Sequence, residues 1–260
     1  MNITLERLIE LYKGGSTLNQ LSVVSGLSAE SVRRRLVPFG VIRGRGYAAR
    51  RYRQDDSFFD VIDTEEKAYW LGFLFADGNV RSRSPNHGEI RLSLKISDRE
   101  HVEKFKAAIK SQSPICVTHR GVAVTLTVTS RQLFDALVRL GCVPNKTNNH
   151  GTPKLPDHLV RHFYRGYIDG DGCIYVKGVR VGLFILGPAK FLTTLRAWIQ
   201  RKTRLPGREL QLTGDNNVIS RLDYGGGQQV QYILDHIYGD SQISLSRKLQ
   251  KYQEVCCRNS

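Results

Sequence analysis

The chain has 260 residues, and its 39 lysines and arginines against 24 aspartates and glutamates give a formal net charge of +15. This length suits one large domain or two small ones, and the charge favours a polyanionic partner, with nucleic acid the leading candidate. The longest strongly apolar run, residues 68–76, is too short to cross a bilayer, and charges interrupt the first ten residues. We therefore expect a soluble, cytoplasmic protein that makes no membrane contact.

Three short helices are predicted in the N-terminal region at residues 5–12, 18–24 and 29–36, with a sharp turn at Gly26. Thr17 and Ser28 stand at N-cap positions. Leu18, Leu21 and Val24 would share one face of the second helix. The pattern predicts a small all-α helix-turn-helix domain over residues 1–42.

The outward face of the third helix is basic. Val32 and Leu36 are predicted to point inward, which leaves Arg33 and Arg34 free to reach bases or phosphates. We interpret the unit as a DNA-binding domain, although small three-helix units also mediate protein contacts.

Residues 43–64 are predicted to be a basic linker, because an arginine-rich segment with two glycines shows neither helical nor strand periodicity. It either follows DNA phosphates or the minor groove, or is a solvated tether without a fixed target. The candidate DNA-binding residues in this segment are Arg43, Arg45, Arg50 and Arg51.

Beyond residue 64 the predicted elements repeat in the order αββαββα. The first copy, residues 65–147, begins with a helix at 65–77, and the second, residues 148–256, begins with a helix at 157–171. In the first copy we expect strands at 79–83, 89–96, 115–120 and 123–129 and helices at 98–110 and 131–140. In the second we expect a hairpin that turns at Lys177-Gly178, helices at 189–202 and 228–237, and strands at 208–212 and 218–224. The fold class is α+β, and the chain is expected to be a monomer with internal pseudo-two-fold symmetry.

The two repeated helices carry small residues four positions apart, at Gly72 and Ala76 and at Gly166 and Gly170. Such pairs lie on one helix face and allow two backbones to approach closely, so we expect the helices to pack on each other.

Each of these helices ends in Asp-Gly, at Asp77-Gly78 and at Asp171-Gly172. We expect both glycines to end their helix in the left-handed conformation. A carboxylate at a helix C-terminus opposes the helix dipole at a cost of about 0.3 to 1 kcal/mol, which a bound cation would remove. Two carboxylates brought together in this way are suited to holding divalent metals against phosphates. The alternative is that Asp-Gly is ordinary turn chemistry.

At these residues the sequence resembles the LAGLIDADG homing endonucleases of the single-chain type with two motif copies, over about residues 65 to 256. The motif copies are residues 70–78 and 164–172, and residues 141–147 and 243–248 resemble the segments that close each half. The sixth motif position is Phe75 in the first copy and Asp169 in the second, so the catalytic role is carried over only to Asp77 and Asp171.

The resemblance implies two four-stranded antiparallel sheets forming a saddle, and cleavage of double-stranded DNA at a long site with staggered cuts. Mg²⁺, or another divalent ion such as Mn²⁺, would be held by Asp77 and Asp171 with the adjoining Gly78 and Gly172. Lys146 and Lys248, or Arg247 in place of the latter, would stabilise charge near the scissile phosphates.

The resemblance further implies that the strands read the DNA in its major groove. Residues 90–96 alternate apolar and polar side chains, which is typical of a strand buried on one side. Arg91 and Lys95 on its polar side, and Lys177 and Arg180 at the matching turn of the second half, are the candidate readers.

Two other functions remain open at this point: a DNA-binding regulator that does not cut, and an RNA maturase that helps an intron fold. Retention of both Asp77 and Asp171 favours the endonuclease, because a regulator has no chemical need for acids in the path of an anionic ligand.

Overall fold

The computed structural model describes residues 3–13, 16–42, 52–143, 152–213 and 219–259. The chain divides into two compact units, Met1–Arg51 and Tyr52–Ser260. Within the described residues no helix is long and apolar enough to span a membrane. The five cysteines are free thiols.

The first unit contains three helices close to the predicted ranges, followed by a 3-10 turn. Its core is built from Leu8, Tyr12, Leu21, Val32 and Leu36, so the inward positions predicted on the third helix are correct. The helices are α1 (Leu5–Lys13), α2 (Leu18–Ser25) and α3 (Ala29–Leu36), and the turn is η1 (Val37–Phe39).

The predicted caps of this unit are confirmed, and of the three residues predicted to share one face of the second helix, Leu21 is buried and Leu18 packs against the core. Thr17 and Gln20 form a capping box, the Ser28 side chain accepts from the Ser31 N–H, and Gly26 adopts the left-handed conformation at a φ of 70°. Val24, however, is 58% exposed. On a helix of only eight residues the core contacts fall on Leu21, and Val24 turns towards solvent.

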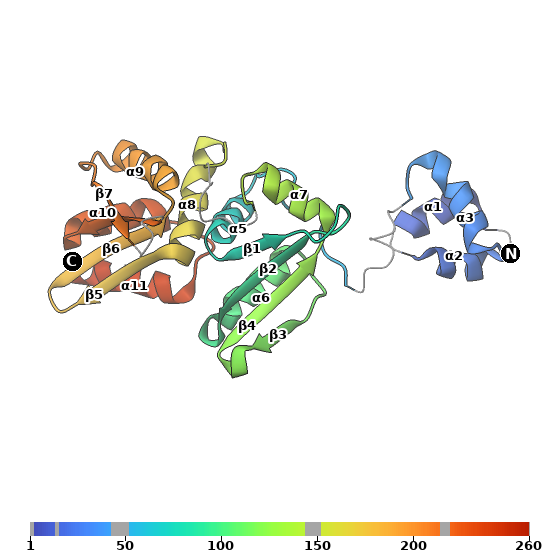
Figure 1. Ribbon diagram of the computed structural model, residues 1–260, viewed down its shortest axis with the longest axis horizontal. Helices are drawn as coiled ribbons and strands as arrows, with labels where there is room; N and C mark the ends of the chain where they lie inside the picture. The colour runs from blue at the N-terminus through green and yellow to red at the C-terminus, as the bar shows by residue number, and fades with distance from the viewer. Residues whose placement is uncertain (1–2, 14–15, 43–51, 144–151, 214–218, 260) are drawn as a thin grey trace. The chain divides into compact units, whose positions relative to one another are not determined.

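The second unit contains two halves, each with a four-stranded antiparallel sheet covered by helices on one face (Figure 1). In the first half the strand order is β1-β2-β4-β3. Helix α5 (Glu65–Ala76) leads into β1 (Gly78–Arg81), β2 (Glu89–Lys95), η2 (Ile96–Asp98) and α6 (Arg99–Ala108). These are followed by β3 (Ile115–Thr118), η3 (His119–Gly121), β4 (Ala123–Thr129) and α7 (Arg131–Arg139).

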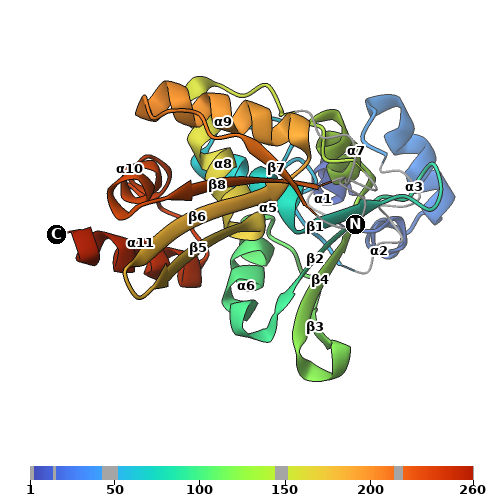
Figure 2. The same ribbon diagram turned by 60° about the vertical axis from the view of Figure 1, so that its left-hand side comes forward.

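The second half repeats this order with strands β5-β6-β8-β7 (Figure 2). Its elements are α8 (Asp157–Asp171), β5 (Gly172–Lys177), β6 (Arg180–Gly187) and α9 (Ala189–Thr203), then β7 (Leu210–Thr213), β8 (Ile219–Gly225), α10 (Gly227–Tyr238) and α11 (Ser246–Asn259). In each sheet one face packs on the helices of its half, and we call the other the open face.

Three features differ from the sequence-based expectation. Phe58, Phe59 and Ile62, assigned to the linker, are buried in the core of the second unit, which therefore begins at Tyr52 rather than at residue 65. Ile96 lies in η2 beyond the end of β2 and is 43% exposed, so the strand's alternation stops at Leu94. Helix α11 was not predicted, because its apolar face is reduced to a narrow row of Leu249, Tyr252 and Val255.

Helices α5 and α8 lie side by side between the two sheets, as the small-residue pattern predicts (Figure 1). A Cβ added to Gly72 would overlap the Phe163 carbonyl oxygen, and one added to Gly166 would overlap the Tyr69 carbonyl oxygen. A Cβ added to Gly170 would lie 2.4 Å from the Ala76 Cβ. The backbones therefore approach more closely than any residue with a side chain permits.

The glycines after the two helices, by contrast, are not left-handed. Gly172 is extended, with φ −88° and ψ 160°, and Gly78 is absent from the positive-φ glycines of the described residues. Each instead begins a strand, and an added Cβ would lie 2.6 Å from Leu74 O at Gly78 and 2.5 Å from Ile168 O at Gly172. Glycine is required at both positions because the first residue of the strand lies in contact with the last turn of the preceding helix, where a side chain would overlap a carbonyl oxygen.

Gly166→Ala is expected to lower the free energy of unfolding by about 3 kcal/mol, the upper end of the cost of overpacking, because the new methyl overlaps rigid backbone of α5. Urea denaturation measures the change. Gly225→Ala is the matched control, since nothing lies within 4 Å of its Cβ position. Equal stability of the two variants would contradict the close approach.

Candidate functional site

The two predicted catalytic carboxylates lie at adjoining ends of α5 and α8. Asp77 is the exposed C-cap residue of α5, and Asp171 is the half-buried last residue of α8. A Cβ on Gly170 would lie 3.3 Å from Asp77 Oδ2, so this carboxylate rests against the last turn of α8. Burial raises the pKa of the Tyr167 phenol well above its usual range, and the negative charges of Asp171 and Asp77 raise it further. Both carboxylates therefore lie near one phenol.

Lys248, predicted to be catalytic, lies directly behind this pair. Its side chain is buried, and its ammonium donates to the carbonyl oxygen of Ile168 at 3.3 Å and to that of Gly172. Burial lowers the pKa of Lys248, and the carboxylates of Asp169 and Asp77 act in the opposite direction. The ammonium thus offsets the negative end of the α8 dipole where Asp171 adds a negative charge.

Asp169, at the motif position where the two copies differ, is fully buried and joins the two halves. Its carboxylate accepts hydrogen bonds from Tyr69 of α5 at 2.7 Å, from Tyr238 of α10 at 2.6 Å and from the Leu245 backbone N–H at 2.7 Å. The last bond fixes the chain just before α11, which carries Lys248. Phe75 occupies the corresponding position of the first half and packs edge-on against Phe163, with ring centroids 5.1 Å apart.

A buried histidine continues this network. The Tyr69 hydroxyl gives its single proton to Asp169 and lies 2.9 Å from His101 Nε2, so His101 must carry its proton on Nε2. His101 Nδ1 is buried without a hydrogen-bond partner among the described residues. Burial lowers the pKa of His101 to about 3, and nearby Lys104 and Arg247 lower it too. His101 is therefore neutral and fixed as one tautomer.

An ion pair joins Glu65, the first residue of α5, to Arg165 in the middle of α8. Arg165 is fully buried and donates to Glu65 Oε1 at 2.6 Å and to the carbonyl oxygens of Ile237 and Ile243 at 3.2 and 2.8 Å. Burial lowers its pKa and the Glu65 carboxylate raises it. His162 Nδ1 lies 2.8 Å from the same guanidinium.

The open face of the first sheet is hollowed into a groove of about 560 Å³. Among the described residues that line it, Arg91 alone is positively charged, and hydroxyls supply most of the remaining polar groups. Ser93 and Thr118 both hydrogen-bond to Thr125, at 2.7 and 3.2 Å. The lining residues are Tyr52, Arg91, Ser93, Pro114, Cys116, Thr118, Thr125, Thr127 and Thr129.

The other predicted DNA-binding residues that the structure describes lie at the surface. Lys95 ends β2, and Lys177 and Arg180 pair across the β5-β6 turn; all three are exposed. Arg33 and Arg34 are exposed on α3 of the first unit. Lys146, Arg43, Arg45, Arg50 and Arg51 lie outside the described residues.

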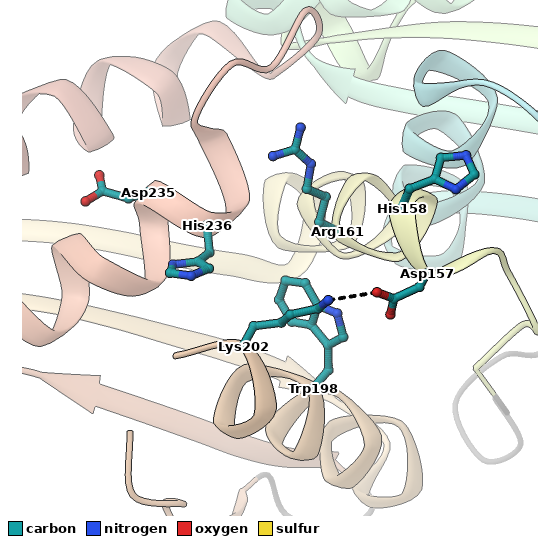
Figure 3. Close-up of a pocket in the computed structure, with 7 residues that line it drawn as sticks. All are labelled: Asp157, His158, Arg161, Trp198, Lys202, Asp235 and His236. Carbon is teal, nitrogen blue, oxygen red and sulfur yellow. Dashed lines mark hydrogen bonds and ion pairs between the residues drawn. The ribbon is translucent and has the colours of Figure 1, made fainter. Parts of the chain in front are cut away.

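A second hollow, of about 480 Å³, lies between α8, α9 and α10 (Figure 3). It is lined by Asp157, the first residue of α8, so it lies at the end of that helix opposite to Asp171. Lys202 bonds Asp157 at 2.8 Å, as Figure 3 shows. Arg161 pairs with Asp240 at 2.8 Å, and Asp235 accepts a hydrogen bond from Tyr252. This hollow is separate from the carboxylate pair.

Several residues of the site were missed by sequence reasoning. Tyr69, Tyr238 and His101 read as ordinary core positions, since nothing local indicates that they converge on Asp169. Glu65 and Arg165 carried no distinguishing signal, because each helix holds other charged residues. Their pairing crosses 100 residues of sequence, and only the helix packing reveals it.

Comparison with solved structures identifies the fold. The chain is similar to the LAGLIDADG homing endonuclease I-LtrWI bound to target DNA, with 12% sequence identity, a TM-score of 0.52, and coverage of 78% of this chain and 90% of that one. It is also similar to I-AabMI bound to uncleaved DNA, at 12% identity and a TM-score of 0.51 over 73% and 88% of the two chains. I-SmaMI bound to cleaved DNA gives 12% identity and a TM-score of 0.50 over 75% and 88%.

The chain has the LAGLIDADG homing endonuclease fold. No protein-family model and no curated protein matches the sequence. At this level of identity the shared feature is the fold alone, and the resemblance noted in the motif copies agrees with it.

The buried histidines make stability depend on pH. Burial lowers the pKa of His162 to about 4, as it lowers that of His101 to about 3, whereas both titrate near 6.5 when unfolded. At these two histidines the unfolded chain therefore binds more protons below about pH 6.5, so their contribution to the free energy of unfolding should be constant above that pH and fall progressively towards pH 4.

His101→Gln is expected to make this fall shallower, since glutamine still offers Tyr69 a donor but does not titrate. Urea denaturation between pH 7.5 and 4.5, followed by tryptophan fluorescence, measures the slope. His158→Gln, at an exposed position, is the control. An unchanged slope in His101→Gln would show that His101 is not buried as the neutral form.

Proposed function

We propose that this protein is a site-specific endonuclease that cuts double-stranded DNA with a divalent metal at Asp77 and Asp171. The observation that carries the proposal is that these two carboxylates, one from each half, lie close together at the C-terminal ends of α5 and α8. Glycines in the two helices allow this close approach. Local stability does not explain an acid at both helix ends, because each opposes its helix dipole. The similarity to homing endonucleases bound to DNA supports the same function.

The side chains present fit a hard divalent cation such as Mg²⁺. Asp77 is exposed and Asp171 half-buried, and carboxylate oxygens are the ligands that Mg²⁺ prefers, completed by phosphates and water. Zinc instead prefers histidine nitrogen and cysteine sulfur as ligands, whereas Asp77 and Asp171 offer only oxygen. Mg²⁺ held there would activate water and neutralise charge on the leaving oxygen.

The remaining residues of the site position the two carboxylates. Asp169 fixes the Leu245 backbone, and Lys248 caps the end of α8, so the carbonyl oxygens of Ile168 and Gly172 bind an ammonium. In this proposal Gly78 and Gly172 shape the site by letting the strands leave the helices closely. The buried Lys248 would contribute positive charge through its contact with the end of α8, and not by direct contact with DNA.

The open faces of the two sheets would bind the DNA, with Arg91, Lys95, Lys177 and Arg180 among the contacts. The overall charge of +15 provides the electrostatic attraction. The hydroxyl-lined groove beside Arg91 offers hydrogen-bonding groups and threonine methyls of the kind that contact base edges in the major groove.

Asp77→Asn is expected to abolish double-strand cleavage in the presence of Mg²⁺ and to leave DNA binding largely intact, because the amide keeps the size of the side chain and loses the charge that holds the metal. Incubating the protein with a DNA library and sequencing the ends produced measures cleavage. Asp171→Asn should behave alike, and Asp135→Asn, on the surface of α7, is the control.

Two results would contradict the proposal. Wild-type protein that binds DNA tightly and salt-dependently yet cuts no sequence would indicate a DNA-binding regulator on this fold. Loss of folding in Asp77→Asn, seen by circular dichroism, would indicate a structural aspartate.

We further propose that the first unit is a helix-turn-helix domain that extends the DNA contact, since Arg33 and Arg34 are exposed on α3 while Val32 and Leu36 form the core. Deleting residues 1–51 is expected to lower the slope of log affinity against log salt by about 0.9 for each phosphate that the unit neutralises. Nitrocellulose filter binding at several salt concentrations measures the slope. An unchanged slope would mean that the unit neutralises few phosphates.

A further inference from the structure

The open face of the second sheet holds an arginine that the sequence reasoning did not single out. Arg221 of β8 bonds the Asp223 carboxylate through Nε, at 3.0 and 2.8 Å, and through Nη2 at 2.7 Å. Its guanidinium carbon lies 4.0 Å from the centre of the Phe184 ring on the neighbouring strand β6. The side chains of Arg221 and Asp223 are 37% and 34% exposed to solvent. Asp223 therefore holds one edge of the guanidinium and Phe184 contacts one of its faces, while the rest of the group remains accessible to solvent.

The strand register places this group on the open face. Leu222 and Tyr224 are buried against the helices, so the alternating residues Arg221 and Asp223 point the other way. Phe184 stands directly opposite Asp223 in the β6-β8 pairing. The cluster therefore lies on the face that the proposed function turns towards DNA.

The chemistry of the pair suits a base edge better than a phosphate. The Arg221–Asp223 pair has almost no net charge, so it adds little to the attraction for the DNA backbone, and Asp223 would repel a phosphate. A G·C pair instead presents guanine O6 and N7 as two acceptors and the cytosine amino group as a donor. Arg221 matches the acceptors, and Asp223 matches the donor.

Among the described residues of the first half, the matching positions hold no equally ordered arginine. In the aligned registers, Thr125 precedes Leu126 as Arg221 precedes Leu222, and Arg91 takes the place of Phe184. Arg91 reaches Glu89 with one long contact of 3.4 Å, and its Nε is buried without a partner among the described residues. Glu89 is engaged by Arg81 at 2.6 Å. The open faces of the two sheets therefore carry differently ordered arginines.

We infer that Arg221, held by Asp223 and Phe184, is a specificity-determining residue that reads a guanine in the major groove of the half-site under the second sheet. The inference rests on the proposed DNA-binding function but not on cleavage. Because the guanidinium is ordered before binding, little conformational freedom is lost on contact, which favours discrimination.

The test is selection of a randomised duplex library by the full chain in EDTA, so that no metal-dependent cleavage occurs, followed by sequencing of the bound DNA. Wild-type protein should enrich guanine at one position of one half-site by roughly 5- to 150-fold. Arg221→Gln should lose this preference at that position and move it towards adenine, which glutamine reads. Other positions should be unchanged.

Two further variants separate readout from folding and from general affinity. Arg221→Lys keeps the charge but not the planar fork, so it should weaken the guanine preference without changing the salt slope. Asp223→Asn should weaken the preference at the same position. Arg201→Gln, an exposed arginine of α9 paired with Asp157, is the matched control and should select the same sites as wild type. Thermal unfolding confirms that each variant is folded.

Three outcomes would overturn the inference: wild-type protein that selects no sequence, an Arg221→Gln variant that retains the guanine, or a uniform loss of affinity over all sequences with a salt slope lower by about 1, which marks a phosphate contact. A chain that selects DNA through Arg221 and never cuts would end the endonuclease proposal and leave this inference standing. A chain that cuts but reads no guanine through Arg221 would do the reverse.

Discussion

The close approach of α5 and α8 is the contact on which the rest of the second unit depends. Gly72 and Gly166 each face a carbonyl oxygen of the opposite helix. The two backbones are therefore in direct contact, with no side chain between them at these positions. Because each helix ends in a carboxylate, this packing also sets the distance between Asp77 and Asp171. One constraint thus joins the halves and assembles the candidate site.

Such close packing leaves polar groups that must be satisfied without water. Two neighbouring groups on α8 do this: Arg165 pairs with Glu65, and Asp169, one turn further along the helix, accepts hydrogen bonds from Tyr69 and Tyr238. Buried polar groups of this kind are stable only when every partner is present, so they tie α10 and the start of α11 to the helix pair. The first half, with Phe75 in place of Asp169, uses aromatic packing instead.

The same asymmetry extends to the open faces of the sheets. Hydroxyls and a loosely held arginine line the first, whereas the second centres on an arginine fixed by a carboxylate and an aromatic ring. A protein built from two similar halves can in this way present two different surfaces to the two halves of a DNA site. The backbone fold is shared, and the side chains on the exposed strand positions distinguish the halves.

Local rules sufficed for most elements and for the helix pair, because hydrophobic periodicity, caps and small residues four apart are properties of neighbouring residues. They placed α8 and β4 at their observed bounds and pointed to Asp77 and Asp171. Tertiary structure alone decided what lies around them: the extended Gly172, the burial of Lys248 against α8, and the partners of Asp169 and Arg221. Those contacts join residues far apart in the chain or on adjacent strands, and their geometry is fixed only when the helices and sheets have packed.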